Sequence, residues 1–143
     1  MLDLYCGAGT ISLFLAKTAG MVIGAEIVPE AIENAKENAV NNNITNVDFV
    51  CAPAEEYLPA NADKIRADVI IMDPPRKGST TSFLDSVMKL KPRKIVYVSC
   101  DPATLARDVK LLTKTYAIKA VQPVDMFPQT FHVETVVKMT LGK

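Results

Sequence analysis

The sequence predicts an α/β protein with a doubly wound, Rossmann-like sheet that is mostly parallel and has an antiparallel pair of strands at its C-terminal edge. Short apolar runs alternate with helical patterns from residue 2 to residue 113, which is the order of strands and crossover helices in a parallel sheet. The last two apolar runs, 116–124 and 134–141, have no helical pattern between them. Parallel neighbours need a long crossover, so these two strands are expected to be antiparallel.

The first half of the chain predicts three strands, each followed by a helix. Phe14 and Val40 belong to apolar patterns that predict buried helix faces. Pro29 suits the first turn of the second helix, and the asparagines at 41–43 end it. The expected strands are 2–5, 21–25 and 47–51, and the expected helices are 10–18, 29–40 and 54–58.

The second half continues the alternation. Residues 68–72 end in a continuous apolar run, as expected for a buried parallel strand. Helices are expected at 81–90 and 102–113, with a strand at 94–99 between them. The last helix is expected to bury an apolar face and to turn its charged residues outward; the two sets are Leu105, Val109 and Leu112, and Arg107, Asp108 and Lys110.

Length and composition describe one globular domain of 143 residues, 49% of them hydrophobic. No apolar run is long enough to span a membrane, and no secretory signal is visible. The formal net charge is zero, so composition alone indicates no nucleic-acid partner. Cys6, Cys51, Cys100 and the single histidine have no metal-ligand spacing. We therefore expect a reducing, cytoplasmic location, with neither disulfides nor a metal site.

Cys100 stands where a strand passes into a helix. Residues 95–98 are β-branched or aromatic, and Asp101 and Pro102 suit the N-cap and first turn of a helix. Ligands of open α/β sheets bind at the carboxyl ends of strands, and a helix N-terminus favours a thiolate. Cys100 is therefore a candidate nucleophile, with a buried packing cysteine as the alternative. Cys6 and Cys51 are expected only to pack.

A glycine turn follows the first strand. Gly7 and Gly9 let the backbone approach a ligand closely, and Glu26, at the end of the second strand, is placed to accept hydrogen bonds from both ribose hydroxyls. A dinucleotide fingerprint requires a third glycine, where this chain has Ser12. Asp3, ahead of the glycines, suits the amino acid end of S-adenosylmethionine better than a pyrophosphate. A turn that only packs is the alternative.

The loop that begins Asp73-Pro74-Pro75 follows the fourth strand. In a doubly wound sheet its place is beside the glycine turn, and the two prolines stiffen it, so Asp73 is held at the crevice. We expect Asp73 to contact the cofactor or the substrate base, with a turn or capping aspartate as the alternative. Arg76 and Lys77 suit phosphate contact, although exposed basic pairs are usually only solvated.

The segment before the last strand contains His132 and Glu134. A glutamate at the start of an edge strand is able to face the same crevice as Cys100, where a carboxylate near a thiolate would suit proton abstraction. Taken without other information, the two residues favour a surface histidine and a charge that protects the sheet edge.

Four segments together resemble the RNA uracil-5-methyltransferase family, whose members form 5-methyluridine in ribosomal and transfer RNA. These segments are Asp3–Gly9, Asp73–Gly78, Ser99–Asp108 and Asp125–Glu134. The last two are the most specific, because general methyltransferases have neither, and the resemblance is closest to the bacterial 23S ribosomal RNA branch. It implies a class I methyltransferase fold, S-adenosylmethionine as cofactor, and an RNA substrate. That substrate would be 23S ribosomal RNA, with transfer RNA as the alternative.

The resemblance also implies residue roles. Cys100 matches the nucleophile and Glu134 the general base. The implied cofactor contacts are Tyr5, Glu26 and Asp73, with weaker contacts from Thr10 and Pro53, beside the turn glycines Gly7 and Gly9. In this chemistry a thiolate adds to uracil C6, which makes C5 nucleophilic towards a sulfonium methyl group. A base then removes the C5 proton, and the target base must leave its stack to be reached.

Two departures from the family pattern are visible. Asp101 stands where the family usually has asparagine, and its carboxylate is expected to disfavour the adjacent thiolate slightly. The family's upstream RNA-binding domain is not in this sequence, and the chain opens inside a strand, so we expect residues 1–143 to be the catalytic domain of a longer protein. Two alternative functions are a cofactor-binding remnant that serves as an interaction module, and an amino-group methyltransferase that uses the Asp-Pro-Pro loop.

Overall fold

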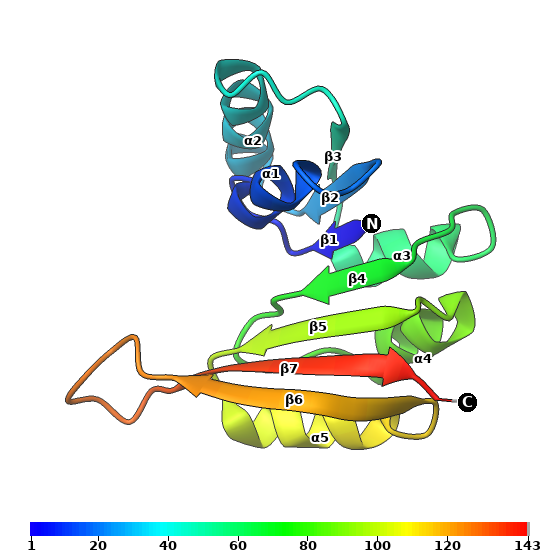
Figure 1. Ribbon diagram of the computed structural model, residues 1–143, viewed down its shortest axis with the longest axis vertical. Helices are drawn as coiled ribbons and strands as arrows, with labels where there is room; N and C mark the ends of the chain where they lie inside the picture. Colours follow the sequence, from blue (N-terminus) through cyan, green and yellow to red (C-terminus); the bar gives the residue numbers. More distant parts are fainter. Residues whose placement is uncertain (143) are drawn as a thin grey trace.

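A computed structural model describes residues 1–142, which form one seven-stranded sheet with helices on both faces (Figure 1). The strand order is β3-β2-β1-β4-β5-β7-β6. The first five strands in the chain are mutually parallel, and β7 is antiparallel to both β5 and β6. The predicted doubly wound sheet and its antiparallel C-terminal pair are therefore confirmed.

Most predicted elements lie within two residues of their observed bounds. The strands are β1 (Leu2–Leu4), β2 (Val22–Glu26), β3 (Val47–Cys51), β4 (Val69–Met72), β5 (Lys94–Ser99), β6 (Tyr116–Val124) and β7 (Glu134–Leu141). The helices are α1 (Thr10–Ala16), α2 (Pro29–Asn41), α3 (Ala54–Asn61), α4 (Thr81–Leu90) and α5 (Pro102–Leu112). Helix α3 was expected to end at Leu58, but it continues through Pro59.

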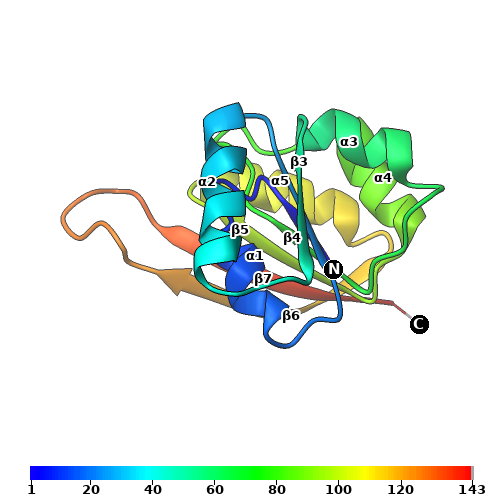
Figure 2. The same cartoon turned by 90° about the horizontal axis from the view of Figure 1, so that it is seen from above.

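The two faces of the sheet have separate apolar cores, and Figure 2 shows the helices on either side. The larger core lies beneath α3, α4 and α5, where Phe83 and Tyr97 are fully buried. The smaller core lies beneath α1 and α2 and includes Phe49. Because both faces of β1 and β4 are covered, the carboxyl ends of these strands open at one edge of a well-packed scaffold.

Two apolar positions that were expected to be buried are exposed. Phe14 on α1 is 72% exposed and Val40 on α2 is 75% exposed. A helix that lies on a sheet buries only one face, and both helices have more apolar residues than that face holds. The expectation for these two side chains was wrong.

Asp108 was expected on the outer face of α5, but it is completely buried. It accepts hydrogen bonds from the Tyr97 hydroxyl at 2.6 Å, the Ser79 backbone N–H at 2.8 Å and Arg107 Nε at 2.8 Å. Leu105, Asp108 and Val109 have the i, i+3, i+4 spacing of a single helix face, so the correction follows from helical periodicity. This carboxylate ties the segment after Gly78 to α5.

Asp108→Ala is expected to lower the free energy of unfolding by about 2–4 kcal/mol. The change leaves the buried Tyr97 hydroxyl and the Ser79 N–H without an acceptor, and each unsatisfied group costs about 1–3 kcal/mol. Urea denaturation measures the loss. Asp85→Ala is the matched control on exposed α4 surface, and it is expected to change stability by less than about 0.5 kcal/mol. Equal stabilities for the two variants would contradict the role given to Asp108.

Candidate active site

A cavity of about 600 Å³ opens at the carboxyl ends of β1, β2 and β4. It is lined by Tyr5, Ala25, Glu26, Ile27, Pro53, Ala54, Glu55, Glu56, Asp73, Pro75 and Lys77. Four of the predicted cofactor residues are therefore brought to one cavity: Tyr5, Glu26, Pro53 and Asp73. This is the place where open α/β sheets bind ligands.

The glycine turn places three left-handed residues within five positions: Tyr5 at φ 69°, Gly7 at φ 53° and Gly9 at φ 80°. A Cβ on Gly9 would lie 2.8 Å from the Phe49 ring, so Gly9 is required for packing of the turn against β3. Gly7 has no atom within 4 Å of a built Cβ, and its N–H donates to Glu26 Oε2 at 3.1 Å. Gly7 thus has open space around it, whereas Gly9 packs closely against the Phe49 ring.

Glu26 is held rigidly at the end of β2. Its Oε1 accepts from the N–H groups of Ile27 and Val28 at 2.8 and 3.1 Å, and its Oε2 accepts from Gly7. Three backbone donors orient this carboxylate. Oε1 already accepts two hydrogen bonds, whereas Oε2 accepts one and has capacity for a further donor such as a ligand hydroxyl group.

Tyr5 and Glu55 form a contact that the sequence analysis missed. The Tyr5 hydroxyl donates to Glu55 Oε1 at 3.1 Å, and the same oxygen accepts from the Thr80 N–H at 3.2 Å. Burial and the negative charge of Glu55 raise the pKa of Tyr5, so it stays neutral. The sequence feature that could have identified Glu55 as a site residue is its position in the first turn of α3, shortly after the end of β3.

Asp73 lines the cavity directly after the end of β4. It follows β4, and its backbone N–H donates to the Leu4 carbonyl at 3.3 Å. Partial desolvation, followed by the negative charges of Glu134 and Asp3, raises the pKa of Asp73.

Cys100 and Glu134 are brought together by the pairing of β5 with β7. The last pair of the ladder is Ser99 with Thr135, and Cys100 and Glu134 are the next residues along the two chains. Both residues are half-buried. The predicted nucleophile and the predicted base therefore both lie just beyond the end of the β5–β7 ladder.

Asp101 caps α5 directly beside Cys100. Its Oδ1 accepts from the N–H groups of Ala103 and Thr104 at 2.9 and 3.0 Å, and its Oδ2 lies 3.6 Å from Arg76 Nε. The Thr104 and Ala103 N–H groups and the Arg76 charge lower the pKa of Asp101. The N-terminus of α5 and Arg76 thus partly balance the negative charge of Asp101. This balance reduces the repulsion that Asp101 was expected to exert on a negative charge at Cys100.

The other two cysteines differ from Cys100 in position. Cys6 lies in the smaller core, and burial together with the charges of Asp3 and Glu26 raises its pKa to about 12, which disfavours a thiolate. Cys51 is exposed at the end of β3, so the expectation that it packs was wrong. All three cysteines lie outside the cavity lining.

Three residues that were predicted to bind the cofactor, Gly7, Gly9 and Thr10, are not among the residues that line the cavity. Thr10 lines a separate, smaller hollow with Leu13 and Phe14. Asp3 is buried beneath the turn, where the Ser12 hydroxyl donates to its Oδ2 at 2.6 Å. Ser12, which stands in place of a third fingerprint glycine, therefore binds the acidic residue ahead of the turn.

The cavity has the charge expected for a cationic ligand. Glu26, Glu55, Glu56 and Asp73 line it with a single cation, Lys77. The positive sulfonium and ammonium groups of S-adenosylmethionine suit the carboxylates of this cavity, and its ribose hydroxyls suit the oriented Glu26. A negatively charged pyrophosphate would be repelled by the same carboxylates. Within residues 1–142 no cluster of three His, Cys, Asp or Glu side chains suits a metal ion.

The strand order, the antiparallel β7 and the carboxylate at the end of β2 define a Rossmann-like methyltransferase domain. The sequence profile of the tRNA (uracil-5-)-methyltransferase family matches residues 1–141. The chain belongs to this family, and the resemblance stated from its motifs is confirmed. S-adenosylmethionine is the family's cofactor.

Individual relatives agree with this assignment. The chain is 56% identical over 140 residues to an uncharacterized RNA methyltransferase of Clostridium tetani, covering 96% of this chain and 30% of that protein. It is 52% identical over 143 residues to one of Listeria innocua, covering 99% and 32%. The chain thus spans about a third of the length of these relatives.

A solved structure shows the same fold with a ligand. The Pyrococcus abyssi tRNA (uracil-54, C5)-methyltransferase, in complex with S-adenosyl-L-homocysteine, superposes with a TM-score of 0.83. It is 39% identical and covers 97% of this chain and 33% of that one. Among residues 1–142 no helix is long and apolar enough to cross a membrane.

Glu26→Ala is expected to weaken binding of S-adenosylhomocysteine by about 1.5–3 kcal/mol, because hydrogen bonds to a charged acceptor are lost. Isothermal titration calorimetry on the two proteins measures the difference. Glu33→Ala, which removes an exposed α2 carboxylate, is the control and should bind like wild type. Unchanged affinity in Glu26→Ala would remove Glu26 from the cofactor site.

Proposed function

We propose that residues 1–143 are the catalytic domain of a longer enzyme that methylates C5 of a uridine in RNA, through a covalent bond between Cys100 and uracil C6. S-adenosylmethionine, when bound, supplies an electrophilic methyl group. Tyr5, Glu26 and Asp73 would hold it, with the Pro53 carbonyl as a further contact and the Gly7 turn leaving space for it. Thr10, which lies in a different hollow, would contribute less directly.

Cys100 provides the nucleophile in this proposal. Uracil C5 is a poor nucleophile, but a thiolate that adds to C6 moves the C5–C6 electron pair towards C5 and O4. The new S–C6 bond makes C5 able to attack a methyl group. Cys100 lies next to the N-terminus of α5, where the helix dipole favours negative charge.

Glu134 provides the base. Once C5 bears both a hydrogen and the methyl group, a base must remove the hydrogen as a proton. The electron pair of the C5–H bond then restores the C5–C6 double bond, and the Cys100 thiolate leaves. The strand pairing supports this role, because Glu134 begins β7 just beyond the last β5–β7 pair, where Cys100 follows β5.

The observation that carries the proposal is the β5–β7 register, in which Cys100 and Glu134 are the next residues after the final pair, Ser99 with Thr135. An amino-group methyltransferase would have no use for a cysteine and a neighbouring carboxylate. The same is true of a cofactor-binding remnant, so both alternatives leave this arrangement unexplained.

The proposed substrate is 23S ribosomal RNA, with transfer RNA as the alternative. The family resemblance is closest to the ribosomal branch, whereas the P. abyssi relative is a transfer RNA enzyme. The test incubates unmodified 23S ribosomal RNA and transfer RNA transcripts with the full-length protein and deuterated-methyl cofactor. Mass spectrometry of the nucleosides should find labelled 5-methyluridine. A label only on exocyclic amino groups would overturn the proposal.

A further inference from the structure

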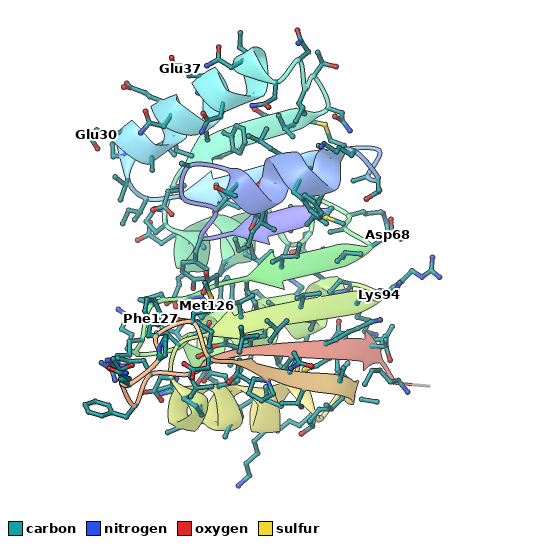
Figure 3. All side chains as sticks on the ribbon, turned by 60° about the vertical axis from the view of Figure 1, so that its left-hand side comes forward. Glu30, Glu37, Asp68, Lys94, Met126 and Phe127 are labelled. Carbon is teal, nitrogen blue, oxygen red and sulfur yellow. The ribbon has the colours of Figure 1, made fainter. Side chains whose placement is uncertain are left out.

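The loop 125–133 between β6 and β7 extends beyond the carboxyl edge of the sheet (Figure 1). Figure 3 shows Met126 and Phe127 at this end, opposite the end that bears Asp68 and Lys94. Glu134 directly follows the loop, so the loop adjoins the candidate active site. Its surface therefore lies beside the proposed base, Glu134, at the carboxyl end of the sheet.

Apolar side chains on this loop face solvent. Phe131 is 90% exposed, more than any other large apolar side chain among residues 1–142, and Met126 and Phe127 are exposed as well. A phenylalanine with so little buried area contributes little to folding. Such a group beside an active site is a candidate for binding.

The loop holds Phe131 in a defined position. The Thr130 backbone N–H and hydroxyl both donate to the Phe127 carbonyl, at 3.2 and 2.7 Å. The His132 N–H in turn donates to the Thr130 hydroxyl at 3.2 Å. Phe131 stands between these bonded residues, so local hydrogen bonds restrict its backbone, and a restricted group loses less entropy on binding.

Phe131 is also part of a row of planar groups that leads to the active site. Its ring centroid lies 5.3 Å from that of His132, and Arg76 NH2 donates to His132 Nδ1 at 3.4 Å. Arg76 continues the row to Asp101, the neighbour of Cys100. The row thus runs from the nucleophile turn outward and includes a cation that suits phosphate.

We propose that Phe131 stacks on an unpaired RNA base adjacent to the target uridine, while Arg76 and His132 face the intervening phosphate. The inference rests on the proposed function, because a uridine taken out of its stack leaves a neighbouring base without its partner. An aromatic ring replaces that partner, and stacking tolerates any base because every base has a flat face. The occupant is therefore single-stranded RNA rather than a duplex.

The test compares Phe131→Ala, Phe131→Leu and Phe131→Trp in the full-length protein. Fluorescence anisotropy at fixed salt measures binding of a short fluorescein-labelled uridine-rich RNA, alone and annealed to its complement. We expect Phe131→Ala and Phe131→Leu to bind the single strand about tenfold more weakly, and Phe131→Trp to bind it like wild type. Duplex binding should stay within twofold for all three.

Phe14→Ala is the matched control, since Phe14 is exposed on α1 and lies in a different hollow. It should behave like wild type. Wild-type affinity in Phe131→Ala, full rescue by leucine, or an equal loss for single strand and duplex would each overturn the stacking proposal. The proposal would also be overturned if Phe131→Ala lowered the melting temperature without changing RNA binding. That result would mean that another part of the full-length protein covers Phe131.

Methyl transfer by the same proteins separates this inference from the proposed function. If wild type binds the single strand through Phe131 but forms no 5-methyluridine in the transcripts, the proposed function fails and the stacking contact stands. If wild type forms 5-methyluridine and Phe131→Ala does so with unchanged affinity and unchanged KM for RNA, the stacking contact fails alone.

Discussion

Cys100→Ala is expected to abolish methyl transfer to RNA, with a fall of more than about 10⁴-fold in rate, as loss of a covalent nucleophile typically produces. Without the sulfur no S–C6 bond forms, and C5 stays too weak a nucleophile to accept a methyl group. Cofactor binding should be unchanged, because Cys100 lies outside the cavity lining. Tritium transfer to RNA and calorimetry with S-adenosylhomocysteine measure the two quantities.

Cys51→Ala is the matched control, because Cys51 is an exposed thiol at a strand end outside the cavity. It should retain full activity. Substantial methylation by Cys100→Ala would move the nucleophile to another group, and Cys6 would be the next thiol to examine. Methylation of an amino group by that variant would favour the amino-group alternative.

Glu134→Gln is expected to attack and methylate the uracil but to stall before proton removal. The amide has nearly the same shape as the carboxylate, yet it is a far weaker base, so the C5 proton stays and the Cys100 sulfur cannot leave. The variant should accumulate a protein–RNA adduct that carries the methyl group and survives denaturation. Turnover should fall by about 10²–10⁴-fold.

A denaturing gel with methyl-labelled cofactor and unmodified RNA detects this adduct. Glu37→Gln removes an exposed carboxylate on α2, far from the active site in Figure 3, and should turn over like wild type without an adduct. If Glu134→Gln completes its cycles at the wild-type rate, Glu134 is only a charge that protects the sheet edge.

The fold followed closely from local sequence patterns. The bounds of α4, β5, β6 and β7 were predicted to the residue from their apolar runs, and Asp101 and Pro102 correctly marked the start of α5. Burial of individual side chains was less predictable. Asp108 is inside and Phe14 outside because the packing of a whole helix decides which residues face the sheet.

The candidate site was predictable where a motif stands at a strand end. Tyr5, Glu26 and Asp73 follow this rule, and they meet in one cavity. Glu55 was missed because its contacts with Tyr5 and Thr80 join three separate elements. The place of Glu134 depends on which strand β7 pairs with and in which register, and neither is encoded within the strand itself.

RNA that contains 5-fluorouridine tests the central claim most directly, because fluorine at C5 cannot leave as a proton and traps the covalent state. Wild type, Cys100→Ala and Glu134→Gln are incubated with such RNA and methyl-labelled cofactor, and the products are separated on a denaturing gel. The account predicts a labelled protein–RNA band for wild type and Glu134→Gln and none for Cys100→Ala. A labelled band in Cys100→Ala, or no band in a wild-type protein that methylates ordinary RNA, would contradict it.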